Sequence, residues 1–181
     1  MTNNIKLQEV CKQLHIPVVG TTSWPLPIEA REILQESNPC PFTAADIDER
    51  LIGTTDFMPH SAIVCLFPYH MPHEGPTNLS RYTWATDYHL VVTDYLQRLV
   101  DELKTTAPDA SFSIHCDTSP LADRYMAYLA GLGFYGKNKC FINPTWGSYI
   151  VIGTVLTTLE FESNTPMTDT CMGCNRCITS C

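Results

Sequence analysis

Four cysteines stand close together at the C-terminal end of this 181-residue sequence, in "CMGCNRCITSC" at 171–181. Their spacing is C-x2-C-x2-C-x3-C, which brings the first three thiolates around one tight turn. Zinc sites usually hold two cysteine pairs apart by a longer loop. The compact spacing is instead typical of bacterial ferredoxins, where it binds a 4Fe-4S cluster. We therefore predict cluster ligands at Cys171, Cys174, Cys177 and Cys181, with a structural zinc site as the alternative.

The last of these cysteines bears on cluster number. In two-cluster ferredoxins the fourth cysteine of the motif ligates the other cluster, whose remaining ligands come from a second copy of the motif. The sequence contains one copy, and it ends on Cys181. We therefore expect a chain truncated within a ferredoxin-like module at residues 163–181, with incomplete clusters and no activity of its own.

An acidic residue in the middle of the chain could do proton chemistry. Asp117 directly follows "SFSIHC", which alternates as a strand does, so its carboxyl stands at a strand end, where α/β sheets form their pockets. A carboxyl buried against an apolar group has a raised pKa and can deliver a proton near neutrality. Two interpretations remain open: Asp117 is such a donor, or it caps the helix that begins around Pro120.

The elements that position these residues alternate between helix and strand. Apolar residues recur at helical spacing most clearly from Tyr88 to Leu103. Further helices are expected at 4–15, within 25–60 and over "PLADRYMAYLAGLG". Strands are expected within 16–25, at 61–68, at 111–116 and at 149–161. The alternation predicts an α/β sandwich with a mixed sheet over residues 1–162.

Composition limits the classes of protein to consider. With 44% hydrophobic residues, the chain can bury one sizeable core, and its net charge of -8 argues against a generally basic surface that coats nucleic acid. The sequence shows no signal segment and no apolar stretch long enough to span a bilayer, so we expect a cytoplasmic protein away from membranes. Thiols stay reduced there, which favours metal binding over disulfides. The remaining cysteines are interpreted as small buried residues: Cys11, Cys40, Cys65, Cys116 and Cys140.

Three blocks, taken in order, carry a family resemblance. They are "RYTWATDYH" at 81–89, "CDTSPLADRYMAYLAGLGFYGKNKCFINPTWGSYIVIGTVLTTLEF" at 116–161, and the terminal cysteines. Together they resemble the epoxyqueuosine reductase family. The resemblance implies an enzyme that uses cobalamin and two 4Fe-4S clusters to reduce epoxyqueuosine in tRNA to queuosine. It also implies a catalytic domain similar to the cobalamin-binding fold of reductive dehalogenases.

The resemblance also assigns roles to single residues. Asp117 matches the proposed proton donor of the family and also contacts the cofactor. Further cobalamin contacts are implied at Arg50, Ser80, Asn138, Phe141, Ser148 and Ile152. Taken singly, Phe141 and Ile152 fit better as ordinary core residues. Asp123 and Arg124 are interpreted as a charged first helical turn or an ion pair.

Other functions compete with the tRNA-modifying reductase. A cobalamin-dependent iron-sulfur enzyme similar to reductive dehalogenases would act on a small molecule with the same cofactors. An iron-sulfur electron carrier would need only the cysteine motif and a docking domain. For the leading hypothesis we expect tRNA as substrate, a low-potential electron donor as partner, and a monomer.

Overall fold

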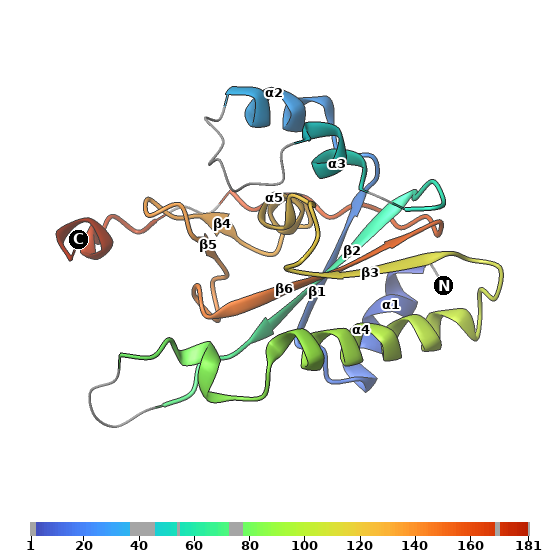
Figure 1. Ribbon diagram of the computed structural model, residues 1–181, viewed down its shortest axis with the longest axis horizontal. Coiled ribbons are helices and arrows are strands. Elements are labelled where there is room, and N and C mark those ends of the chain that lie inside the picture. Colours follow the sequence, from blue (N-terminus) through green and yellow to red (C-terminus); the bar gives the residue numbers. More distant parts are fainter. Residues whose placement is uncertain (1–2, 37–45, 54, 73–77, 169–170, 181) are drawn as a thin grey trace.

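The protein forms a four-stranded sheet with a layer of helices on each face (Figure 1). The computed structural model describes residues 3–36, 46–53, 55–72, 78–168 and 171–180. The predicted α/β sandwich is confirmed. No helix within these described ranges combines the length and apolar character needed to cross a membrane.

The sheet is antiparallel in each of its three pairings, so the expectation of a mixed sheet is wrong. Its strands are β1 (Val18–Ser23), β2 (Ser61–Pro68), β3 (Phe112–Cys116) and β6 (Ile150–Thr157), in the order β1-β2-β6-β3. Parallel strands were expected because helical connections usually join parallel strands. The central strand β2 has a continuous apolar sequence because helices cover both of its faces.

Helices α1 (Asn3–Gln13) and α4 (Tyr88–Lys104) cover one face of the sheet. Both were predicted from their spacing of apolar residues. Asp87 caps α4 by accepting a hydrogen bond from the backbone N–H of His89 at 2.9 Å. The apolar side of α4 buries Val92, Leu96, Leu99, Val100 and Leu103 against the sheet.

Helix α5 (Asp123–Leu129) lies on the opposite face, with α2 (Ile28–Glu36) and α3 (Ile47–Ile52) beyond it (Figure 1). The two fully buried residues Met126 and Ala127 anchor α5 on the sheet. Its contact with β1 is close: a Cβ atom added at Gly20 would lie 2.4 Å from the backbone oxygen of Ala130. Only glycine fits there without a shift of the backbone.

Short elements complete the chain near the edge of this second layer. Strands β4 (Phe134–Tyr135) and β5 (Phe141–Ile142) form a small hairpin, and helix α6 (Arg176–Thr179) is the last element (Figure 1). The segment 163–181, expected to belong to a ferredoxin-like module, begins in contact with the sheet. The backbone N–H of Thr21 donates to Oδ1 of Asn164 at 2.7 Å. That residues 163–181 form a separate module stays a prediction.

The scattered cysteines differ in their environment. Cys11, Cys65 and Cys116 are buried, as predicted. Cys140 is exposed, so its interpretation as a buried residue is wrong, because it lies in the turn of the β4–β5 hairpin rather than in the core. Cys40 lies outside the described residues.

Candidate functional site

A cavity of about 1060 Å³ opens on the α5 side of the sheet. Its walls come from α2, α3, α5, the start of α4, the β4–β5 hairpin and the first half of β6. Ile150 and Ile152 form its base, because alternate side chains of β6 point toward α5. Segments distant in the sequence therefore build one site.

Asp117 stands at the edge of this cavity, directly after β3. Its φ of 60° lies in the left-handed region, and the N–H of Thr118 donates to the carbonyl of Cys116 at 2.6 Å, so Asp117 is the centre of a tight turn. A residue other than glycine that is held in this left-handed conformation often marks a functional position. Helix α5 begins later, with Ala122 as its N-cap, so the alternative that Asp117 caps this helix is wrong.

Two side chains of α4 meet the carboxylate of Asp117. The hydroxyl of Tyr88 donates to Oδ2 at 2.5 Å, and Nε2 of His89 lies 3.5 Å from the same oxygen. The hydrogen bond to Asp117 raises the pKa of Tyr88 strongly, because the tyrosine proton is held by a carboxylate. The side chain of Asp117 is nevertheless 63% exposed, so its described protein neighbours do not supply the burial expected for a donor.

A second carboxyl lines the same cavity at Asp123, the first residue of α5. Burial first, and the charge of Asp117 second, raise the pKa of Asp123 to about 7. Among the described residues Asp123 makes no ion pair, and Arg124 instead donates to the backbone oxygen of Lys139 at 3.1 Å. Of the two interpretations of Asp123 and Arg124, the charged first helical turn is therefore confirmed and the ion pair is wrong. No role in the site was assigned to Asp123 from the sequence, because a helix start is where acids are ordinarily found.

Four of the other predicted cofactor contacts line the cavity: Arg50, Phe141, Ser148 and Ile152. Phe141 and Ile152 also pack in the core on the α5 side, so the two interpretations of these residues hold together. That any of them contacts a cofactor stays a prediction.

Ser80 and Asn138 do not line the cavity but shape segments that do. The carbonyl of Ser80 accepts the N–H of Thr83 at 3.0 Å and so starts the short 3-10 helix η1 (Arg81–Trp84), which carries Tyr82 into the wall. Oδ1 of Asn138 accepts the N–H of Cys140 at 3.1 Å and orders the β4–β5 turn.

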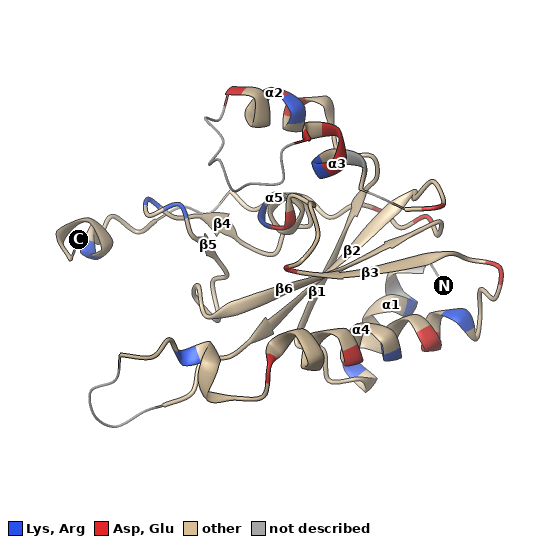
Figure 2. Cartoon of the chain, in the orientation of Figure 1, with Lys and Arg blue, Asp and Glu red and all other residues tan. Residues whose placement is uncertain are grey.

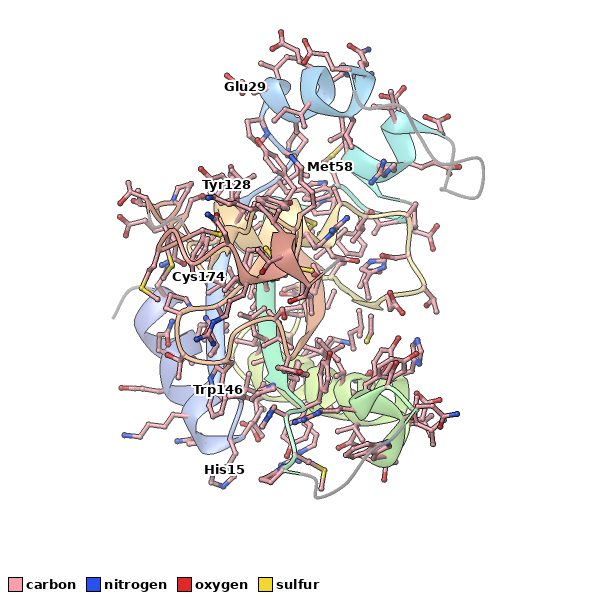
Figure 3. All side chains as sticks on the ribbon, turned by 90° about the vertical axis from the view of Figure 1, so that its left-hand side faces the viewer. His15, Glu29, Met58, Tyr128, Trp146 and Cys174 are labelled. Atoms are coloured by element: carbon pink, nitrogen blue, oxygen red, sulfur yellow. The ribbon has the colours of Figure 1, made fainter. Side chains whose placement is uncertain are left out.

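Tyrosines form much of the cavity wall. That they lie together was not predicted from the sequence, because they are scattered along the chain. The set is Tyr69, Tyr82, Tyr88, Tyr125, Tyr128 and Tyr135. Tyr82 and Tyr88 meet edge to face with ring centroids 5.8 Å apart, and the rings of Tyr128 and Tyr135 are 6.0 Å apart. Figure 3 shows Tyr128 between helix α2, marked by Glu29 above, and the turn that carries Trp146 below. Such a wall offers flat apolar surface with hydroxyls at its rim.

The cysteine segment contacts the hairpin of the cavity. The backbone N–H of Lys137 donates to Sγ of Cys171 at 3.2 Å, and its Nζ donates to Oδ1 of Asn175 at 2.7 Å. Cys174 and Cys177 are exposed, and Cys181 lies outside the described residues. Within the described part of the chain, no three His, Cys, Asp or Glu side chains converge as a metal site would require. Cys174 is seen at the edge of the molecule in Figure 3.

Sequence comparison identifies similar proteins. Residues 57–118 match the family model described as "Epoxyqueuosine reductase QueG, DUF1730". An epoxyqueuosine reductase of Bacillus cereus is 41% identical over 101 residues, covering 56% of this chain and 27% of that protein. The enzyme of Bacillus subtilis is 30% identical over 190 residues, covering 97% of this chain and 49% of the relative. The chain thus spans about half the length of that relative.

Solved structures agree in fold. The epoxyqueuosine reductase of Streptococcus thermophilus superposes with a TM-score of 0.84 at 25% identity, over 100% of this chain and 52% of that chain. A structure of epoxyqueuosine reductase with an epoxyqueuosine-modified tRNA-Tyr stem loop gives 0.80 at 28% identity, over 97% of this chain and 50% of the other. A B12-dependent reductive dehalogenase gives 0.54 at 14% identity, over 90% of this chain and 20% of that one, which supports a shared fold alone.

Proposed function

The chain belongs to the epoxyqueuosine reductase family. We propose that it binds cobalamin in its cavity and there reduces epoxyqueuosine in tRNA to queuosine. The observation that carries the proposal is the placement of Asp117, held by Tyr88 at the edge of a large tyrosine-lined cavity. An acid beside a broad apolar site suits a reaction in which an oxygen must be protonated as it departs.

The residues present fit cobalamin. A cavity of about 1060 Å³ is slightly larger than the usual range for small-molecule sites, which is about 300–1,000 Å³, and so has room for a macrocycle. Its tyrosine and isoleucine walls offer flat apolar contact for a corrin ring. Arg50 and Ser148 supply polar groups for the amides at the ring's periphery. When bound, cobalamin would supply a strongly reducing cobalt centre.

The protein's own residues would manage the proton and the substrate. Asp117 would give a proton to the epoxide oxygen, and contact with the apolar cofactor and substrate would provide the burial that the described protein neighbours leave incomplete. Tyr88 and His89 would hold the carboxyl toward the cavity through its Oδ2.

Cluster ligands are proposed at Cys171, Cys174, Cys177 and Cys181. Thiolate ligands and an amide hydrogen bond to sulfur, as Lys137 makes to Cys171, are usual features of iron-sulfur sites. Since the cysteine segment contacts the β4–β5 hairpin, a cluster there would lie beside the cavity and could pass electrons from a low-potential donor.

A local group of basic residues supports tRNA as the substrate despite the net charge of -8. Residues 125–159 contain Lys137 and Lys139 but no acidic residue. Figure 2 shows these bases on the β4–β5 turn, with another basic residue on α6 beyond it, Arg176. Phosphate contacts from such a patch would orient an anticodon loop toward the cavity. We propose a cytoplasmic monomer, since tRNA and reduced thiols are found together there.

The function is tested with the 181-residue chain, cobalamin and titanium(III) citrate, a chemical reductant that bypasses the clusters. The substrate is an anticodon stem loop that carries epoxyqueuosine, and mass spectrometry of the digested nucleosides measures the product. We expect loss of one oxygen atom to give queuosine, dependent on both cobalamin and this reductant. With a protein electron donor in its place the chain should stay inactive, because its clusters are expected to be incomplete. Cobalamin bound stoichiometrically with no queuosine formed would contradict the proposal. Loss of halide from an organohalide under the same conditions would favour a small-molecule reductase instead.

A further inference from the structure

The proposed reaction needs two protons, whereas the carboxyl of Asp117 holds one at a time. Removing an epoxide oxygen as water breaks both C–O bonds, forms a C=C bond and consumes two electrons and two protons. The electrons come from the low-potential donor of the proposed function, on which this inference rests. A second carboxyl, that of Asp123, lines the same cavity and takes no part in the steps described above.

We propose that Asp123 is the second proton donor of this site. Asp117 protonates the oxygen as the first C–O bond breaks, which leaves a hydroxyl on the substrate. As the C=C bond forms and the second C–O bond breaks, the proton of Asp123 passes to the departing hydroxyl and releases it as water. Both carboxylates then take up protons from solvent.

The geometry separates an outer and an inner carboxyl. Asp117 is 63% exposed and tied to Tyr88 and His89 on α4. Asp123 is half-buried in the cavity wall and belongs to α5, which packs on the sheet. The outer group can be reprotonated directly by solvent, whereas the inner group exchanges its proton with bulk water less readily.

Two buried hydroxyls belong to segments around this pair. Oγ of Ser119, in the loop between the two aspartates, and Oγ1 of Thr154, on β6, make no hydrogen bond of normal geometry among the described residues. Thr154 is fully buried and lies close enough to Asp123 to favour its carboxylate form. Buried polar groups usually have partners, so the Thr154 hydroxyl that acts on Asp123, together with the buried Ser119 hydroxyl in the loop between the two acids, suits a place where protons or a polar ligand are handled.

The charges around Asp123 favour its protonated form near neutrality. Burial and the negative charge of Asp117 raise its pKa to about 7, while the Thr154 hydroxyl opposes the shift. Burial and the charges of Asp117, Asp123 and Asp87 likewise raise the pKa of the Cys116 thiol to about 11. The other titratable or charged groups that line the cavity are Arg50 from α3, Arg124 on α5, Cys140 in the β4–β5 turn and the six tyrosines of its wall. An acid with this pKa is suited to proton donation at neutral pH.

The first test follows the proton without any turnover. Infrared spectra of the chain labelled with carbon-13 aspartate report protonated carboxyls as a function of pH. We expect one such carboxyl near pH 7, absent in Asp123→Asn, with a lower midpoint in Asp117→Asn and a higher one in Thr154→Val. Complete ionisation of Asp123 by pH 5 would overturn the proposal.

The second test measures single-turnover deoxygenation with cobalamin, titanium(III) citrate and the modified stem loop. We expect the wild-type rate to fall above about pH 7, and Asp123→Asn to be slower by about 10–100-fold, without that pH-dependent limb and with unchanged cobalamin affinity. Asp123→Glu should recover most of the rate. The matched control is Asp94→Asn, an exposed acid on α4 outside the cavity, which should behave as the wild type.

The outcomes separate this inference from the proposed function. Wild-type deoxygenation with the same rate and pH profile in Asp123→Asn would overturn the inference and leave the function intact. A failure of the wild type to remove the oxygen, with cobalamin bound and Asp123 titrating near pH 7, would overturn the proposed function and the proton delivery with it.

Discussion

The hydroxyl of Tyr88 donates a hydrogen bond of 2.5 Å to Oδ2 of Asp117, although 29 residues separate the two in the sequence. Tyr88 is the first residue of α4, and Asp117 follows β3, so the bond ties the helix on one face of the sheet to the loop that leads to the other face. The bond also fixes the direction of the carboxyl at the cavity edge.

Tyr88→Phe should therefore weaken catalysis while sparing the fold. We expect deoxygenation about tenfold slower, because a hydrogen bond to a charged group contributes about 1.5 kcal/mol or more. Single-turnover rates and cobalamin affinity, measured by visible absorbance, check this. Tyr95→Phe on the same helix is the control, since Tyr95 packs on Phe67 rather than lining the cavity. Equal rates for Tyr88→Phe and the wild type would show that Tyr88 does not orient the acid.

Asp117→Asn should bind cobalamin normally but lose about 10²–10⁴-fold in turnover, since the amide keeps the shape of the side chain but cannot donate an acidic proton. The same visible titration and stem-loop assay measure both quantities. Unchanged turnover in this variant would remove Asp117 from the donor role.

Asp123→Asn should change how stability depends on pH. The pKa of Asp123 is raised from 3.8 to about 7 in the folded protein, so the native state binds this proton more tightly than the unfolded chain does. The resulting stabilisation is complete below about pH 4 and is lost as the pH rises through about 7. The variant lacks this dependence and should be more stable than the wild type by roughly 1–3 kcal/mol at pH 8. Urea unfolding at a series of pH values measures this, and parallel curves for the two proteins would contradict it.

Gly20→Ala should destabilise the domain. The added Cβ would lie 2.4 Å from the backbone oxygen of Ala130 and 2.8 Å from a methyl group of Leu132, so α5 would have to move off β1. We expect a loss of about 1–3 kcal/mol in the free energy of unfolding, as for other overpacked contacts. Gly147→Ala is a useful comparison: Gly147 has open space around it, and strain comes only from its φ of 62°. A Gly20→Ala protein as stable as the wild type would contradict the close contact.

Iron content tests the cluster ligands. If Cys181 serves a second cluster, the motif supplies three ligands to one cluster and one to another, so neither is complete. We then expect much less than four iron atoms per chain after anaerobic reconstitution, without loss of the folded domain. Elemental analysis and circular dichroism measure the two quantities. Four iron atoms per chain with a stable cluster absorption would mean that Cys181 completes the first cluster or that another molecule supplies a ligand.

The sequence by itself determined the elements whose signals are local. The three- and four-residue spacing from Tyr88 to Leu103 predicted α4, and the continuous apolar segment 61–68 predicted β2. Both succeeded because the spacing of apolar residues reports directly which faces of an element are buried. Asp117 was singled out in the same way, as an acid directly after a strand.

Only the tertiary structure decided how these elements meet. The antiparallel sheet, the tyrosine wall and the contact of Tyr88 with Asp117 all join residues that are far apart along the chain. The character of Asp123 depends on the same fact. Its position at a helix start suggested a charged first turn or an ion pair, whereas packing of α5 on the sheet places it in the wall of a cavity that a second carboxyl also lines. Burial and neighbouring charge are set by the assembled layers, and no local spacing of residues encodes them.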